Sequence, residues 1–330
     1  MAAKFDIDIT RRSVVGALAL GGLAPTFARA QGAYPAGQTV RMVVPFAPGG
    51  ATDVIGRLVA ERLAAKWGSP VVIENLGGAG ANIGMERVAK SQPDGSQLLF
   101  TSPAVATNQF LYPSLSYNPE TDLVPVSLSA VAPALLLARN TLEPKTMAGF
   151  IAYAKANPGK LTWGHNGAGT ATHMTGELFR RMAGIDIRGV AYRSGALAMN
   201  DTIAGNIDLL IDNISSALPQ VQGGNVKCLG ISSAKRHPPT PELEPIADAV
   251  PGFEAVAWFG VMARAGTPSA ILARIEADAM EAAKDASVVE RLGKLASASV
   301  GSSAKDFASL IADERQRWGR LIKELGIKLE

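Results

Sequence analysis

The chain has 330 residues, of which 47% are hydrophobic and 6% aromatic, and its formal net charge at pH 7 is +3. This length predicts two lobes, and the aliphatic-rich composition favours parallel sheets covered by helices over a β-sandwich. The small net charge and the lack of an arginine-rich cluster argue against nucleic-acid binding, and Cys228, the only cysteine, excludes an intramolecular disulfide.

The first thirty residues predict an export signal. A basic segment that ends in Arg11 and Arg12 precedes an uncharged run over residues 14–24, and an A-x-A cleavage site ends at Ala30. The run is too short to span a bilayer, and the paired arginines resemble a twin-arginine signal, which leaves the export route open. We expect cleavage near Ala30 and a periplasmic protein. Cleavage removes four basic and two acidic residues, so the formal net charge falls to +1.

From Thr39 onward, the sequence repeats a short β-branched run, a glycine-rich turn and a helical pattern. This order is typical of an α/β fold with mostly parallel sheets flanked by helices. The first unit has a strand at 40–44, a turn at 45–50 and a helix whose apolar face includes Leu58 and Leu63. Further strands are expected at 71–75, 98–101, 131–138, 161–163, 187–192, 207–211 and 226–231.

The chain is expected to pass twice between two lobes. Residues 112–125, rich in Pro, Ser and Asn, predict a long surface connection before the first passage, and the prolines of 238–241 close the middle lobe. Helices expected at 271–284 and 306–325 return to the first lobe. The predicted parts are a cleaved export signal at 1–30, lobe 1 at 31–135, lobe 2 at 136–252 and a return to lobe 1 at 253–330.

Two loops are candidate anion-binding sites, because each joins a strand to a helix through small residues. The first loop runs from Pro45 to Asp53 and the second from Asn166 to His173. Such loops expose the unpaired N–H groups of a helix's first turn, and glycine lets a ligand approach the backbone closely. Two facing loops can reach the roughly 8.2 kcal/mol of a micromolar complex. The alternative is that both loops only connect strands to helices.

Motifs of several enzyme classes are absent or altered. Residues 78–84 read G-x-G-x-x-x-G after the second strand, which is not the spacing of a dinucleotide-binding fingerprint, and no P-loop triplet occurs. His165, His173 and His237 show no zinc-binding spacing, and no G-x-S-x-G motif is present. We therefore expect no catalytic residues, no cofactor and no metal site.

Several side chains keep two interpretations open. His173 either contacts a ligand or packs behind the second loop. Asp212 and Asn213 end a strand, where they either recognise an amine or hydroxyl of the ligand or cap the next helix. Trp258 and Phe259, expected in a loop, either wall the cleft or belong to the core.

Several segments recur in a recognisable order along the chain. They are VVPFAPGGATD at 43–53, EN at 74–75 with glycines at 77–84, PDG at 93–95, GAGT at 167–170 with His173, WFG at 258–260 and GTP at 266–268. In this combination the sequence resembles the tripartite tricarboxylate transporter solute-binding receptors, also called Bug receptors. These receptors are type II periplasmic binding proteins.

The resemblance implies a two-lobed Venus-flytrap fold in which backbone amides and ordered water from the two loops hold a carboxylate. The implied binding residues are Phe46, Ala47, Gly49, Gly50, Thr52 and Asp53 in the first loop, Gly167, Gly169, Thr170 and His173 in the second, and Asp212 for ligand-specific contact. One departure lies in Tyr192-Arg193-Ser194-Gly195, where Ser194 stands in the family's glycine position.

The leading hypothesis is a monomeric periplasmic receptor that captures a small carboxylate by hinge closure. The expected ligand is a mono- or dicarboxylate, an aromatic acid or an amino acid, and the expected partners are the membrane permease subunits of a tripartite tricarboxylate transporter. A receptor that signals to a membrane sensor kinase is the first alternative. The second is an exported hydrolase or isomerase that uses His173 and Asp212.

Overall fold

The computed structural model describes residues 34–326, which form an α/β fold with a mixed sheet and flanking helices. The predicted α/β class is confirmed, although the sheet combines parallel and antiparallel pairs. The predicted export signal at 1–30 lies outside the described residues. Within the described range, no helix has both the length and the apolar character needed to cross a bilayer.

The strands of the described residues join in the order β2-β1-β3-β9-β4-β7-β5-β6, and β8 and β10 also pair with β4. β1 runs parallel to β2 and β3, and β5 runs parallel to β6 and β7, whereas β4 and β9 run antiparallel to their neighbours. The bounds are β1 Val40–Val44, β2 Val71–Asn75, β3 Gln97–Thr101, β4 Leu123–Ala138, β5 Thr162–His165, β6 Arg188–Ala191, β7 Leu209–Asn213, β8 Lys227–Ile231, β9 Val256–Arg264 and β10 Ala298–Ser299.

Strand β4 belongs to two halves of the sheet. Residues 123–133 pair with β9, and residues 134–138 pair with β7 and β8. We call β1, β2, β3, β9, β10 and the start of β4 the first half, and β5, β6, β7, β8 and the end of β4 the second half. The change of partner lies near the predicted boundary at residues 135 and 136, and the division into lobes stays a proposal.

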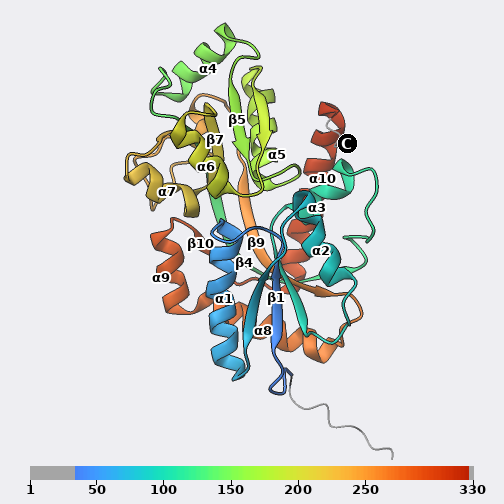
Figure 1. Cartoon of the computed structure of the whole chain (residues 1–330). Coiled ribbons are helices and arrows are strands. Elements are labelled where there is room, and N and C mark those ends of the chain that lie inside the picture. Colours follow the sequence, from blue (N-terminus) through green and yellow to red (C-terminus); the bar gives the residue numbers. More distant parts are fainter. Residues whose placement is uncertain (1–33, 327–330) are drawn as a thin grey trace, which may run out of the picture. The chain divides into compact units, whose positions relative to one another are not determined.

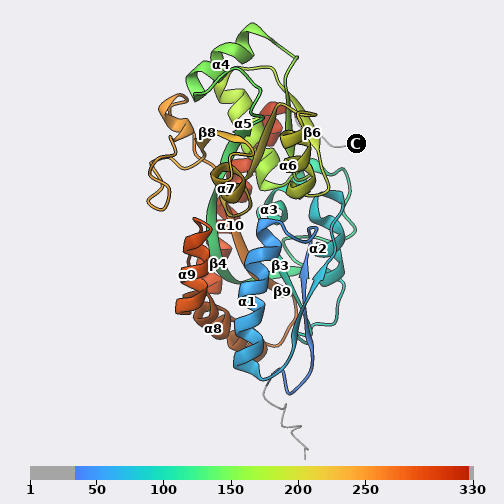
Figure 2. The same ribbon diagram turned by 60° about the vertical axis from the view of Figure 1, so that its left-hand side comes forward.

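Helices gather around each half, as Figures 1 and 2 show: α1, α8 and α9 lie beside the first half, and α4 to α7 surround the second. Both predicted C-terminal helices are confirmed as α8 and α10. The helical bounds are α1 Ala51–Trp67, η1 Ala79–Ala81, α2 Asn82–Ala89, α3 Ala104–Leu111, α4 Met147–Ala156, α5 Ala171–Ala183, α6 Gly195–Ala204, α7 Ile214–Gln222, η2 Ile246–Asp248, α8 Ser269–Lys284, α9 Ala286–Lys294 and α10 Ala304–Leu325.

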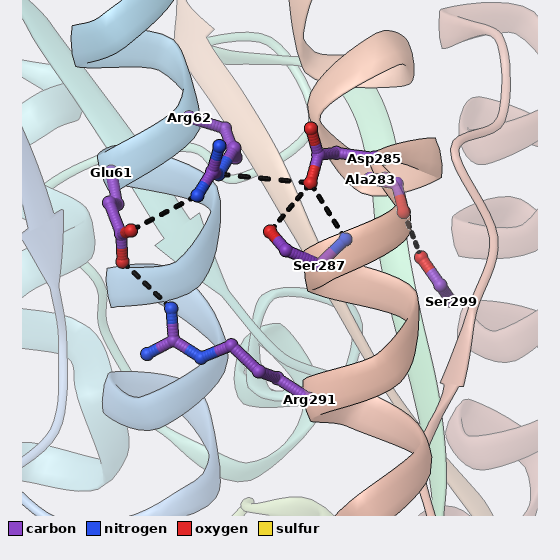
Figure 3. Close-up of polar contacts among 7 residues, drawn as sticks. All are labelled: Glu61, Arg62, Ala283, Asp285, Ser287, Arg291 and Ser299. Carbon is purple, nitrogen blue, oxygen red and sulfur yellow. Dashed lines mark hydrogen bonds and ion pairs between the residues drawn. The ribbon is translucent and has the colours of Figure 1, made fainter.

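Two ion pairs join α1 to α9 and to Asp285, the residue before α9 (Figure 3). Arg291 Nη1 lies 2.8 Å from Glu61 Oε2, and Arg62 Nε lies 3.8 Å from Asp285 Oδ1. Asp285 also caps α9 by accepting a hydrogen bond from the Ser287 amide. An exposed pair such as Glu61–Arg291 contributes little free energy. These contacts show that α9 packs beside α1, the helix that follows the first loop.

The prediction of a loop around Trp258 and Phe259 is wrong, because both residues lie in β9 and are buried. The turn signal came from Gly260. In the fold, a Cβ at Gly260 would lie 2.5 Å from the Phe307 ring, so this glycine makes room for an aromatic side chain. The Trp258 and Phe307 rings meet edge-on at 5.3 Å, and Trp258 is a core residue.

The predicted surface connection at 112–125 is also shorter than expected, since β4 already begins at Leu123. Helix α3, from Ala104 to Leu111, was not predicted. Its short sequence, AVATNQFL, is too apolar to show an amphipathic pattern. It matters for function because it lies directly after the end of β3.

Candidate functional site

The inner pocket lies where β1, β3, β5, β6 and β7 end and the next helices, α1, α3, α5, α6 and α7, begin. Open α/β sheets bind their ligands at such carboxyl ends. The pocket holds about 430 Å³ of space that no atom fills, part of it open to solvent. It is lined by Phe46, Ala47, Gly50, Ala51, Thr52, Ser102, Asn166, Thr170, Ala171, Thr172, Ser194, Gly195, Asn213 and Phe259.

The inner pocket is suited to an anion although no ionisable side chain lines it. The first residues of α1, α5 and α6 form part of its wall, and the first amides of a helix have no acceptor within the helix. No side chain caps α1 or α7. The helix dipoles add partial positive charge at the same place. Backbone N–H groups, and not a counter-ion, are therefore the donors available to a carboxylate.

Polar side chains complete the inner pocket. Thr52 is 6% exposed and lies in the first turn of α1. The buried side-chain oxygens of Asn166 and Asn213 have no hydrogen-bond partner among the described residues. Buried polar atoms of this kind are normally satisfied by protein or water. The pocket is thus set up for a polar occupant or for ordered water that bridges to one.

The first loop is held in shape by Asp53, whose carboxylate points away from the pocket. It accepts hydrogen bonds from the Gly49 amide at 2.9 Å, from Asn75 Nδ2 at 2.9 Å and from Arg57 Nε at 3.0 Å. Burial alone would raise the pKa of Asp53, but these hydrogen bonds outweigh it and lower the pKa. Asn75 Nδ2 also donates to the Phe46 carbonyl oxygen at 3.0 Å. Asp53 therefore supports the loop instead of touching the pocket.

The second loop is held by His173 in the same indirect way. The Gly169 amide donates to His173 Nδ1 at 3.1 Å, and Thr170 Oγ1 donates to the Gly167 carbonyl oxygen at 2.7 Å. The His173 ring stacks on Trp163, with centroids 6.1 Å apart. Burial, with a smaller contribution from Arg180, lowers the pKa of His173 to about 4. His173 is thus a neutral acceptor for the loop at neutral pH.

Asp212 lies fully behind the pocket wall. Its carboxylate accepts hydrogen bonds from the Asn213 amide at 2.9 Å, from Ser216 Oγ at 2.8 Å and from Asn166 Nδ2 at 3.4 Å. A Cβ at Gly195 would lie 2.9 Å from its Oδ1. Burial raises the pKa of Asp212 in spite of these hydrogen bonds. The carboxylate organises the wall residues Asn166, Gly195 and Asn213.

An outer pocket adjoins the inner one and shares Phe46, Ala47 and Asn166 with it. It holds about 1360 Å³ of space that no atom fills, and part of this space is open solvent. Its remaining lining residues are Pro45, Pro48, Asn75, Gly77, Gly78, Ala79, Gly80, Ala81, Gly167, Ala168, Ala191, Tyr192 and Arg193. Outside the part masked at the termini, no cluster of three His, Cys, Asp or Glu side chains is arranged to hold a metal ion.

The structure places the eleven predicted binding residues in two groups. Six of them line a pocket: Phe46, Ala47, Gly50, Thr52, Gly167 and Thr170. The other five line neither pocket: Gly49, Asp53, Gly169, His173 and Asp212. For His173 the geometry favours the packing interpretation over direct contact. The predicted capping of the next helix by the Asp212 or Asn213 side chain is wrong, because no side chain caps α7 and Asp212 instead bonds the Ser216 hydroxyl. Direct contact of any of these residues with a ligand stays a prediction.

Sequence reasoning missed Ser102 as a lining residue, and it did not name Thr172 or Gly195 individually as binding residues. Ser102 directly follows a strand that was predicted, so the rule that ligands bind at strand ends would have found it. Gly195 and Ser194 begin a short helix after β6. They were noticed only because Ser194 departs from the family pattern. Ser194 Oγ caps α6 by accepting a hydrogen bond from the Leu197 amide at 3.3 Å.

Known proteins resemble this chain over nearly its whole length. The model of the tripartite tricarboxylate transporter family receptor matches residues 55–327. Protein BugT of Bordetella pertussis is 35% identical and aligns with 90% of this chain and 92% of its own. Two solved structures are also similar. Rpa4515 of R. palustris with adipate has a TM-score of 0.86 and 34% identity, and the match covers 88% of this chain and 99% of that chain. MatC of Rhodopseudomonas palustris with bound malate has a TM-score of 0.82 and 33% identity, and the match covers 86% of this chain and 99% of that chain. The chain therefore belongs to the tripartite tricarboxylate transporter receptor family.

Proposed function

We propose that this protein is a periplasmic receptor that captures a small carboxylate in the inner pocket and delivers it to the permease of a tripartite tricarboxylate transporter. The observation that carries this proposal is the meeting of the N-termini of α1, α5, α6 and α7 around a pocket without ionisable side chains. Of these, α1 and α7 have no side-chain cap. Amide donors in a low-dielectric hollow bind a carboxylate without the desolvation of a counter-ion. Similar proteins have been solved with adipate and with malate.

Both halves of the sheet contribute lining residues to the inner pocket, which supports capture by closure. Thr52 and Ser102 come from the first half of the sheet, and Thr170, Gly195 and Asn213 come from the second. A ligand that contacts both groups favours the arrangement in which they face each other. Strand β4, which pairs in both halves, is the natural hinge element, because a change in its twist moves one half relative to the other.

The sensor-kinase alternative shares the same pocket and differs only in the partner. It predicts that ligand-bound protein changes the activity of a membrane kinase and that substrate uptake does not depend on it. The enzyme alternative is less well supported, because His173 and Asp212 line neither pocket and both are committed to structural hydrogen bonds.

Calorimetry with the purified protein and a panel of small mono- and dicarboxylates tests the receptor function. We expect at least one acid to bind with a dissociation constant at or below about 1 µM, equivalent to about 8.2 kcal/mol. Uncharged amides of the same acids should bind at least about 100-fold more weakly, because they lack the charge that the helix N-termini favour. If amides bind as tightly as acids, carboxylate capture is wrong. Uptake of the bound acid by cells, lost on deletion of either receptor or permease, tests the delivery step.

A further inference from the structure

The outer pocket is the continuation of the inner one. The two share Phe46, Ala47 and Asn166. A ligand whose acid group lies among the helix N-termini can therefore extend its chain past these three residues into the outer pocket. Whatever lines the outer pocket meets the distal end of the ligand and decides which distal groups are accepted.

Arg193 is the only Lys, Arg, His, Asp or Glu residue among the lining residues of the two pockets. Its surroundings leave its charge without a protein partner: Arg193 forms no ion pair with any residue between 34 and 326. By contrast, Arg57, near the first loop, pairs with Asp53 at 2.9 Å and with Asn75 Oδ1 at 3.1 Å. Arg193 is thus the cation available to a ligand in this cleft.

The other polar side chains of the outer pocket are already used. Tyr192 Oη donates to Asp201 Oδ2 at 2.7 Å. Asn75 Nδ2 donates to Phe46 and Asp53, and its Oδ1 accepts from Arg57. The rest of the lining consists of glycine, alanine, proline and phenylalanine, apart from Asn166. A second charged group on a ligand would therefore meet one charged side chain in the outer pocket, the positively charged Arg193.

The backbone around Arg193 is fixed on both sides, so the base of its side chain is well placed. The Tyr192 amide donates to the His165 carbonyl oxygen at 2.9 Å, and Ser194 caps α6. An arginine on such a support presents a planar fork that matches a carboxylate in two parallel hydrogen bonds. The residue that departs from the family pattern, Ser194, is therefore part of the support of this arginine.

We infer that Arg193 forms a second acid-binding subsite, so that the preferred ligand is a dicarboxylate with one carboxylate in the inner pocket and the other on Arg193. This inference rests on the proposed carboxylate capture and adds the class of ligand to it. Arg193 selects diacids and contributes nothing to the binding of an acid that ends in a methyl group.

The experiment compares α,ω-dicarboxylates of four to eight carbons with straight-chain monocarboxylates of the same lengths, by calorimetry. The wild-type protein binds the best diacid at least about tenfold more tightly than its matched monoacid, which corresponds to about 1.4 kcal/mol. In Arg193→Gln this tenfold gain disappears while monoacid affinity changes by less than about twofold. In Arg193→Glu the diacid binds more weakly than the monoacid.

Arg188→Gln is the matched control, because Arg188 is an exposed arginine of the neighbouring strand β6 and lines neither pocket. It should keep the diacid preference. Raising the salt concentration from about 0.05 to about 0.5 M should reduce the diacid gain, because Arg193 is exposed and its interactions are screened.

The two proposals fail in different ways. If monoacids and diacids bind the wild-type protein equally well, or if Arg193→Gln and Arg188→Gln behave alike, the Arg193 subsite is wrong and carboxylate capture stands. If no acid of either series binds better than its amide, carboxylate capture itself is wrong, and the subsite falls with it. Circular dichroism of each variant establishes that the substitutions act on binding and not on folding.

Discussion

The hydroxyl of Thr107 in α3 donates a hydrogen bond of 2.6 Å to the carbonyl oxygen of Gly169 in the second loop. The next residue, Asn108, donates through Nδ2 to the Gly80 carbonyl oxygen at 2.8 Å. At Gly80 a Cβ would lie 2.3 Å from the Ala168 carbonyl oxygen. Helix α3 thus joins the second loop to a segment that follows β2. The loop is held where it faces the first loop across the inner pocket.

Gly169→Ala should disrupt this contact and weaken ligand binding. Gly169 has φ +82°, and a Cβ there would lie 2.2 Å from Asn108 Oδ1, so the loop must withdraw from α3. We expect the affinity for carboxylates, measured by calorimetry, to fall at least about tenfold.

Gly159→Ala is the matched control for the cost of backbone strain. Gly159 has a similar φ, +71°, but its added Cβ would meet Asp186 Oδ2 only at 3.4 Å, and Gly159 lines neither pocket. It should destabilise the protein slightly and leave affinity within about twofold. Equal loss of affinity in both variants would mean that the contact between α3 and the second loop has no role in binding.

Thr52→Ala tests whether the Thr52 hydroxyl, in the first turn of α1, binds the ligand. Thr52 is buried in the wall of the inner pocket, and a hydrogen bond to a charged acceptor contributes roughly 1.5 to 3 kcal/mol. We expect mono- and dicarboxylates to lose affinity alike, by about 10- to 100-fold. For monoacids this loss should exceed that caused by replacing any single arginine. Thr146→Ala, which removes the N-cap of α4, should not affect affinity. An arginine variant that loses more affinity for monoacids than Thr52→Ala would overturn binding through amides and Thr52.

The sequence predicts the first and second loops well because glycine-rich strand-to-helix turns leave a local signal. That signal places Phe46, Gly50 and Thr170 in the two loops, and the resemblance to the receptor family named them as binding residues; all three line the inner pocket. The roles of Asp53 and His173 could not be predicted. Each is the last residue of its loop, but its side chain folds back onto Gly49 or Gly169, and only the three-dimensional contacts show this.

The remaining walls come from long-range packing. Ser102 and Phe259 reach the inner pocket because β3 and β9 pair in the centre of the sheet, with Thr101 opposite Gly260. No periodicity within either segment indicates that they meet. In the same way, Gly260 appeared to be a turn residue, whereas its contact with Phe307 depends on a helix that begins over forty residues later.

The buried pair His165 and His173 should make the protein sensitive to mild acid. Burial, together with the neighbouring His173, lowers the pKa of His165 to about 3, and burial lowers that of His173 to about 4. The unfolded chain takes up these protons near pH 6.5, and the folded chain does so only near pH 3 to 4. Stability is therefore full above pH 6.5 and falls as the pH drops toward 4, by a few kcal/mol in total.

Urea unfolding at pH 7.5 and pH 5.0 measures this effect. His173→Gln, whose side-chain oxygen can still accept from the Gly169 amide, should lose part of the difference between the two pH values. His237→Gln should retain it, because His237 is only half-buried, bonds the Ala296 carbonyl oxygen and is not part of this pair. If His173→Gln keeps the whole wild-type difference between the two pH values, the burial of a neutral His173 is wrong.

Asp212→Asn separates support of the pocket wall from contact with the ligand. The raised pKa of Asp212 means that its charged form is disfavoured in the fold, so this group destabilises the protein at pH values above its raised pKa. Asparagine keeps the hydrogen bonds: its oxygen can accept from the Asn213 amide, and its NH₂ can donate to Ser216 Oγ. Ser216 Oγ then donates to the Asn213 carbonyl oxygen, which already lies 3.0 Å away.

We expect Asp212→Asn to unfold at higher urea concentration than wild type near pH 7.5, and this gain to vanish near pH 3, where the wild-type carboxyl is protonated in both states. Carboxylate affinity should change by less than about threefold, because Asp212 lines neither pocket. Asp212→Ala should lower both stability and affinity, since Asn166 and the Asn213 amide lose their acceptor. A loss of affinity above about tenfold in Asp212→Asn, without loss of stability, would instead make Asp212 a direct ligand contact, as the resemblance to the receptor family implied.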